Sequence, residues 1–279
     1  MSDIIGLQNH AYPESRPSPQ TGKKTKGKHL LKISILAMLL LLAGYSVYHL
    51  FILPFNTTAK IQVLGINNIH EAELKKAVGL TGTEKWGKID KDVLLHRVAS
   101  YPLVAEARVV KKYPNTVLIE IIERKPVGIL LATVGGRTIS MEIDKTGTVF
   151  KAASETGSQQ MPVISGLSFQ TIRAGMKVHK QLVPLFKQLD LLQKKNPVLL
   201  SEISEIKIEQ KKYGGFDLIL YPVQTQVKVR TDSTLNEERL RYMMLALDVI
   251  QKFGLTAEIE ELDVRAGTAS YRLRGEANE

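Results

Sequence analysis

The stretch YPLVAEARVVKKYPNTVLIEIIERKPVG, residues 101–128, decides how the chain is organised. Two apolar runs flank Tyr113-Pro114-Asn115, and Pro and Asn both favour tight turns. The second run ends in Glu123-Arg124-Lys125-Pro126. We therefore predict a β-hairpin that closes one small domain at residue 126, with Pro126 and its charged neighbours setting the angle to the next domain.

A second decisive feature is an apolar run upstream of the hairpin. Residues 33–53 contain no Lys, Arg, Asp or Glu, and about 20 such residues in a helix cross a hydrocarbon core of about 30 Å. Five lysines precede the run, at positions 23, 24, 26, 28 and 32, whereas the next 20 residues contain only Lys60. Positive charge stays on the cytoplasmic side, so we predict a cytoplasmic N-terminus and extracytoplasmic domains.

Two alternatives to a membrane anchor are weaker. A cleaved signal peptide has a shorter apolar region, and Pro54-Phe55-Asn56 is not a small-residue cleavage site. A buried helix of a soluble domain rarely lacks charge over 21 positions. Tyr45, Tyr48 and Phe51 lie near the outer end, as expected of an interfacial aromatic belt.

Composition bounds the remaining possibilities. The chain has 279 residues, 44% hydrophobic, and a net charge of +10, which allows an anionic membrane or a nucleic acid as partner without selecting between them. There is no cysteine, so disulfides, zinc–thiolate sites and thiol nucleophiles are excluded. Residues 1–32 are rich in Pro, Ser, Gly and Lys, and we predict a disordered, basic, cytoplasmic tail.

The pattern after the span predicts a small domain over residues 58–126. A strand at 59–66 is followed by a helix at 70–80, a second helix at 91–100 with Asp90 as N-cap, and the hairpin. Two helices over one face of a small sheet form an α+β layer.

Residues 127–279 predict a second, β-rich domain with two helices. The expected strands are at 128–134, 138–144, 148–150, 203–210, 216–221, 225–230, 258–264 and 269–275. One helix is predicted over 178–195, with Leu182, Leu185, Leu189 and Leu192 on one side. For the other, over 235–253, Thr234 and Glu237 form a predicted capping box, Gly254 ends the helix, and the apolar face comprises Leu240, Met243, Met244, Leu247 and Ile250.

No motif predicts an active site. Residues 82–89 match G-x-x-x-x-G-K but place Ile89 where a phosphate loop needs Ser or Thr, and the same fault occurs at 22–29 with His29. The six histidines lack metal-binding spacing, and no G-x-S-x-G elbow occurs. The basic runs at 193–195 and 210–212 lack interleaved aromatic residues. We therefore predict no catalytic, cofactor or metal site and no nucleic-acid partner.

The hairpin resembles the signature of the FtsQ/DivIB family of bacterial cell-division proteins. The matching residues are Pro102 and Val104, Lys112-Tyr113-Pro114, Thr116 to Ile122, and Glu123-Arg124-Lys125-Pro126. MEIDKTGTVF (141–150), MPVISG (161–166) and ELDVRAGTASYRL (261–273) are similar to later family motifs, and IQVLGINNIHEAEL (61–74) to the opening of its POTRA domain. Three positions depart from the family signature. Leu103 stands where the family usually has Trp, Ala105-Glu106 stands where a more basic pair is usual, and Tyr101 stands where Leu is common.

The resemblance implies a POTRA domain followed by a β domain in a bitopic inner-membrane protein of the division septum. It implies a non-enzymatic role in the divisome, linking early cytoplasmic division proteins to late septal peptidoglycan synthesis through contacts with FtsB/DivIC-type and FtsL-type proteins. The family binds FtsB-type partners through its last strand and the adjacent helix.

By position, that resemblance selects five candidate contact residues. They are Tyr271, Arg272 and Leu273 on the last strand and Arg239 and Tyr242 on the helix. A short terminal strand offers backbone groups for strand addition. The plainer interpretation is that Tyr271 only packs on its own sheet.

Two other classes fit less well. An outer-membrane assembly component carries several POTRA units before a large barrel, and the residues after 126 are too few for that barrel. An anchored cell-wall hydrolase would need an active site that the motifs do not supply.

Overall fold

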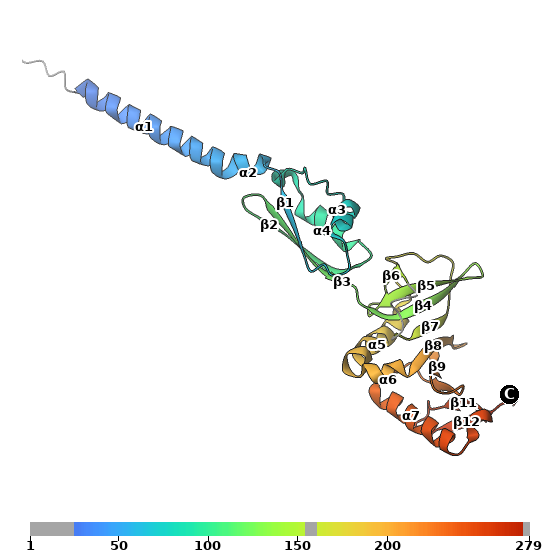
Figure 1. Ribbon diagram of the computed structural model, residues 1–279. Coiled ribbons are helices and arrows are strands. Elements are labelled where there is room, and N and C mark those ends of the chain that lie inside the picture. Colours follow the sequence, from blue (N-terminus) through green and yellow to red (C-terminus); the bar gives the residue numbers. More distant parts are fainter. Residues whose placement is uncertain (1–24, 154–160, 276–279) are drawn as a thin grey trace, which may run out of the picture. The chain divides into compact units, whose positions relative to one another are not determined.

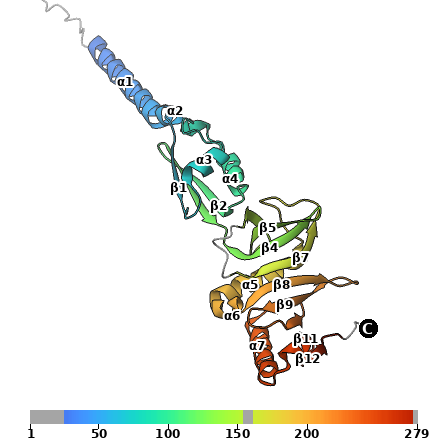
Figure 2. The same ribbon diagram turned by 45° about the vertical axis from the view of Figure 1, so that its right-hand side comes forward.

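The computed structural model describes residues 25–153 and 161–275 and has the predicted α+β class (Figures 1 and 2). The chain forms two compact units, one ending at Phe55 and one starting at Asn56.

The N-terminal unit is helical. It consists of α1 (Thr25–Val47), a π-helical stretch η1 (Tyr48–Ile52) and α2 (Leu53–Asn56). Residues Lys28–Ile52 form 25 residues of helix that is apolar enough to cross a membrane, and none of it is buried. At 1.5 Å per residue this helix measures about 37 Å, more than the roughly 30 Å of a hydrocarbon core. The described residues therefore contain one candidate span.

The helix starts earlier than predicted. Residues 1–24 of the predicted disordered tail lie outside the described residues, but residues 25–32 are helical. Lys and Leu are good helix formers. Once the apolar run has formed a helix, each residue added to its end gains one backbone hydrogen bond. The prediction of disorder was therefore wrong for residues 25–32.

The globular unit begins with a three-stranded sheet. Its elements are β1 (Lys60–Leu64), α3 (Glu71–Ala77), η2 (Trp86–Lys88), α4 (Lys91–Ala99), β2 (Val104–Lys112) and β3 (Thr116–Glu123). The strand order is β1-β3-β2, with β1 parallel to β3 and the predicted hairpin antiparallel. Asp90 caps α4 as predicted, because its side chain accepts from the amides of Asp92 and Val93.

One carboxylate organises the turn between β1 and α3. Glu123, the last residue of β3, accepts hydrogen bonds from the amides of Asn67, Asn68 and Ile69 at 2.7–3.0 Å. Burial by itself would raise the pKa of Glu123, but these donors outweigh it, so the pKa lies below its ordinary value. Glu123 is thus a fixed anion that holds a backbone turn.

The second sheet has nine strands in the order β12-β11-β10-β9-β8-β7-β4-β5-β6. The strands are β4 (Pro126–Val134), β5 (Arg137–Asp144), β6 (Val149–Ala152), β7 (Val163–Phe169), β8 (Ile203–Gln210), β9 (Phe216–Pro222), β10 (Lys228–Thr231), β11 (Ile259–Asp263) and β12 (Ser270–Leu273). The helical elements between them are η3 (Lys180–Leu182), α5 (Val183–Lys195), α6 (Pro197–Ser201), α7 (Glu237–Lys252) and η4 (Leu255–Ala257). The two sheets have separate hydrophobic cores.

The helices differ from the prediction at their starts. The α-helix α5 begins at Val183, five residues later than predicted, because Pro184 lacks a backbone donor and is tolerated only in the first turn. The N-cap of α7 is Asn236, whose side chain accepts a hydrogen bond from the amide of Arg239. The prediction of a capping box formed by Thr234 and Glu237 was therefore wrong. The amide of Thr234 instead bonds to Asp232. Gly254 ends α7 in the left-handed conformation, as predicted.

Strand β7 was not predicted. Gly166 interrupts its apolar pattern, and the structure shows why glycine is needed there. Its φ is +85°, and an added Cβ would lie 2.2 Å from the carbonyl oxygen of Ile208 on β8. Close backbone approach between parallel strands therefore excludes any larger residue.

Arg124 joins the two sheets. Its Nε donates to the carbonyl oxygen of Pro102 at 2.9 Å, and its Nη1 lies 2.5 Å from Oδ2 of Asp144. The other oxygen of Asp144 accepts from the amides of Thr146 and Thr148. The Arg124 and Asp144 side chains are only 13% and 4% exposed, so this is a buried ion pair with further hydrogen bonds on both partners.

Candidate partner-binding edge

Strand β12 is the terminal strand of the nine-stranded sheet. It runs antiparallel to β11, with Leu262 opposite Tyr271 and Asp263 opposite Ser270 (Figure 1). The outer side of a terminal strand presents backbone N–H and C=O groups in a row, which is the geometry that a further strand needs. The sequence prediction that the last strand forms an edge is therefore confirmed.

A groove lies beside this edge, between α7 and the strands β11 and β12. Its volume is about 440 Å³. The lining is almost wholly apolar and consists of Tyr242, Leu245, Ala246, Val249, Ile250, Phe253, Leu255, Ile259, Leu262, Ala269 and Tyr271. Apolar side chains of an added segment would therefore find a matching surface next to the strand edge.

Helix α7 supplies one wall of the groove because its apolar residues cover more than its core face. Leu240, Met243, Leu247 and Ile250 are buried. Leu245, Val249 and Phe253 follow at four-residue spacing and are 66%, 52% and 75% exposed. Residues four apart lie on one face of a helix, so these three form a continuous exposed ridge. Such an exposed apolar ridge is typical of an interaction surface.

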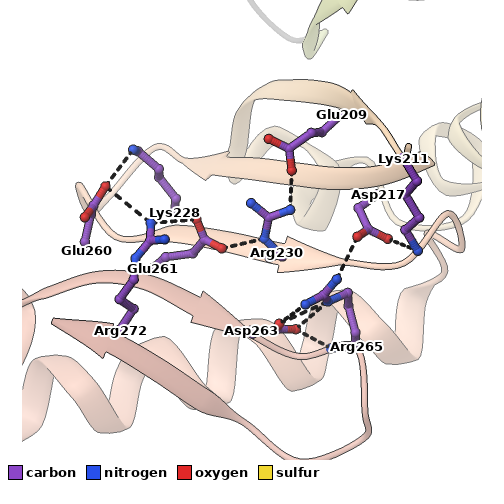
Figure 3. Close-up of polar contacts among 10 residues, drawn as sticks. All are labelled: Glu209, Lys211, Asp217, Lys228, Arg230, Glu260, Glu261, Asp263, Arg265 and Arg272. Carbon is purple, nitrogen blue, oxygen red and sulfur yellow. Dashed lines mark hydrogen bonds and ion pairs between the residues drawn. The ribbon is translucent and has the colours of Figure 1, made fainter. Parts of the chain in front are cut away.

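The opposite face of β12 belongs to a network of ion pairs (Figure 3). Arg272 lies 3.2 Å from Glu261 on β11, and Glu261 lies 2.5 Å from Arg230 on β10. Arg230 in turn pairs with Glu209 on β8. Charges thus alternate in sign from β8 to the edge, and the network ties a strand of only four residues into the sheet.

The network also sets the charge state of its members. The hydrogen bond from Lys228 and the charge of Arg272 lower the pKa of Glu260. Burial alone would raise the pKa of Asp263, but its bonds to Arg265 outweigh this and lower it. These carboxylates therefore stay ionised at neutral pH and act as fixed counter-charges.

The structure brings together two of the five predicted contact residues. Tyr271 is 62% exposed and lines the groove with Tyr242. Leu273 packs partly against the core. Arg272 lies on the other face of the sheet, as strand alternation requires.

Arg239 has an internal structural contact on each terminal nitrogen. Its Nη1 donates to the carbonyl oxygen of Val264 and its Nη2 to Asp232. It does not line the groove. That Arg239 contacts a partner stays a prediction.

Sequence reasoning missed Leu245, Val249 and Phe253. The signal was present, because these three residues repeat every four positions between the members of the core stripe. Assigning a single apolar face to residues 235–253 obscured this second face.

The edge strand β2 of the three-stranded sheet is less suited to strand addition. Strand β2 carries Glu106, Arg108 and Lys112 as exposed charged residues, which oppose strand addition. Across residues 25–153 and 161–275, no group of three or more His, Cys, Asp or Glu could hold a metal ion.

Comparison with known proteins supports the resemblance noted in the sequence. Residues 57–124 match the family model described as POTRA domain, FtsQ-type. The chain is 27% identical to the cell division protein FtsQ of Koribacter versatilis over 73% of this chain and 61% of the relative. It is 23% identical to the cell division protein FtsQ of Myxococcus fulvus over 77% of this chain and 73% of that relative. It is 24% identical to the FtsQ of Geotalea daltonii over 68% of this chain and 67% of that relative. Residues 57–124 therefore form an FtsQ-type POTRA domain, and the chain as a whole, with its α+β fold and apolar N-terminal helix, is similar to cell division proteins of the FtsQ/DivIB family.

Proposed function

We propose that this chain is a non-enzymatic, membrane-anchored scaffold of the divisome that binds its partners by strand addition. In this proposal α1 crosses the inner membrane with the N-terminus in the cytoplasm. Residues 58–126 and 127–279 act as two extracytoplasmic domains at the septum. The chain thereby links early cytoplasmic division proteins to the control of septal peptidoglycan synthesis.

The observation that supports partner binding most strongly is the terminal strand β12 beside an apolar groove. A strand added to β12 would alternate its side chains between two different surfaces. One set would face the groove of Tyr242, Val249 and Tyr271, and the other would face the ion-pair network that ends in Arg272. Backbone pairing would then supply affinity, and the two surfaces would supply specificity.

We assign this surface to an FtsB/DivIC-type protein, with FtsL as a further member of the complex. Similarity to FtsQ cell division proteins supports a divisome partner. A partner segment of this kind needs apolar residues at alternate positions and acidic residues facing Arg272 or Arg274.

Titration calorimetry of the full chain in nanodiscs against an FtsB-type periplasmic segment tests the assignment. Tyr271→Ala removes a side chain that lines the groove, and we expect a loss of about 30-fold in affinity, equivalent to roughly 2 kcal/mol. Tyr213→Ala is the matched control, because Tyr213 is 93% exposed on the β8–β9 turn. Equal affinities for the two variants would remove the assignment.

Depletion of the protein in cells tests the division role itself. We expect long filaments without septa. Normal septation after depletion would contradict the scaffold function, whichever partner binds the edge.

A further inference from the structure

The end of the small domain that follows the membrane span carries a basic, aromatic surface. We call it the basic collar and define it as Lys60, Lys85, Lys112 and Tyr113. The three lysines are exposed, and Tyr113 is 57% exposed. None of the three lysines forms an ion pair with another described residue, so their charge is not used inside the fold.

Backbone contacts hold the collar together. The amide of Lys60 donates to the carbonyl oxygen of Asn115 at 2.8 Å, which places the start of β1 beside the β2–β3 turn. Thr58 forms an antiparallel bridge with Lys85, and the amide of Trp86 donates to Thr57. The collar is therefore a built surface, formed by three separate chain segments.

Trp86 braces the same surface from within. Its indole Nε1 donates to the carbonyl oxygen of Thr116 at 3.1 Å, and Nζ of Lys111 lies 4.5 Å from the ring centroid. The nearest acid on that loop, Glu84, accepts hydrogen bonds from Thr81 and Gly82. Glu84 contributes one negative charge against the three positive charges of Lys60, Lys85 and Lys112, so the net charge of the collar is positive.

If α1 crosses a membrane, the short connection to β1 limits how far the collar can lie from that membrane. The candidate span ends at Ile52, and Thr57 is only five residues further on. Even fully extended, five residues reach about 18 Å, and the headgroup layer itself extends roughly 6 Å beyond the hydrocarbon core. Lysines near an anionic surface are attracted to it, and Tyr and Trp favour the interface.

We propose that the basic collar docks on anionic phospholipid headgroups of the membrane that α1 crosses. Docking would hold the small domain at the bilayer and limit the positions of the β12 edge. The inference rests on α1 crossing the membrane and not on the identity of the protein partner.

The single tryptophan of the chain provides the test. The full chain is placed in nanodiscs of phosphatidylcholine with a headgroup spin-labelled lipid, with or without phosphatidylglycerol, and quenching of Trp86 fluorescence is measured. We expect stronger quenching in the anionic discs and its loss as salt is raised to about 0.5 M, where charges are screened. Equal quenching in neutral and anionic discs would overturn the proposal. This outcome is independent of whether the protein supports normal septation in cells.

A pair of variants locates the effect. The double variant Lys60→Gln, Lys112→Gln lacks two lysines that face the anionic surface in this proposal. It should therefore lower the ratio of docked to undocked small domain on the order of 30-fold. Lys180→Gln with Lys212→Gln removes the same charge from exposed positions of the nine-stranded domain and should leave quenching unchanged. An equal loss in both variants would show that total charge, and not the collar, binds the lipid. If the first variant fails to fold, the salt dependence of the unaltered chain decides alone.

Discussion

Replacing Arg124 by Met should destabilise the junction strongly. The change removes the partner of Asp144, whose side chain is only 4% exposed, and the donor to the carbonyl oxygen of Pro102. Breaking a buried ion pair from one side costs about 3–5 kcal/mol. Asp144 keeps its bonds to Thr146 and Thr148, so we expect the lower end, about 3 kcal/mol. For a unit of this size that corresponds to a fall of about 6–12 °C in Tm.

Differential scanning calorimetry of the full chain in detergent measures this fall. Arg108→Met is the matched control, because the Arg108–Glu120 pair is 3.7 Å apart and 76% and 40% exposed. Such an exposed pair is worth at most about 1 kcal/mol. Asp144→Asn and the double variant complete a mutant cycle. Additive effects of Arg124→Met and Asp144→Asn would refute the reasoning, because they would show that the two side chains do not interact.

Two further stability predictions follow from single residues. Glu123→Gln should lower the free energy of unfolding by about 1.5–3 kcal/mol at about pH 7, since it weakens charge-assisted bonds to three amides. The pKa of Glu123 is lowered by folding, so the unfolded chain binds the proton more readily. The contribution is therefore complete above the ordinary Glu pKa and is lost as the pH falls through the folded pKa. Urea unfolding should show that the difference in free energy of unfolding between Glu123→Gln and the unaltered chain shrinks as the pH falls from about 7 to about 3. A difference that stays constant over this range would contradict the role given to Glu123. Gly166→Ala should cost about 2 kcal/mol or more by urea unfolding, since it adds a backbone clash to left-handed strain. Gly214→Ala, with a φ of +96° and no atom within 4 Å, should cost only the strain; equal costs would contradict the close approach to β8.

The sequence predicts most of the fold where the local signals are strong. The hairpin at 104–123, the Asp90 cap and the Gly254 helix end each depend on residues a few positions apart, and the structure confirms them. The order of the nine strands could not be predicted, because pairing of β4 with β7 or of β10 with β11 depends on long-range packing. Strand β7 was not predicted, because Gly166, which its packing against β8 requires, interrupts the apolar pattern of the strand.

The candidate site was predictable only in part. Strand alternation suffices to separate Tyr271 from Arg272, but their surroundings come from β11 and α7, which lie elsewhere in the sequence. The internal contacts of Arg239 with Val264 and Asp232 likewise depend on tertiary structure. The ridge on α7 is different, because the four-residue spacing of its apolar residues is a purely local signal.

Hydrogen exchange at the β12 amides tests strand addition most directly. The full chain in nanodiscs is measured with and without an FtsB-type periplasmic segment at about 100 times its Kd. If the segment adds to the edge, an outward-facing amide of Ser270 or Tyr271 should exchange about 100-fold more slowly, since exchange then occurs only from the small unbound fraction. Amides of Val149–Ala152, on the opposite terminal strand β6, should not change. Binding of the segment with unchanged exchange throughout β12 would contradict the account.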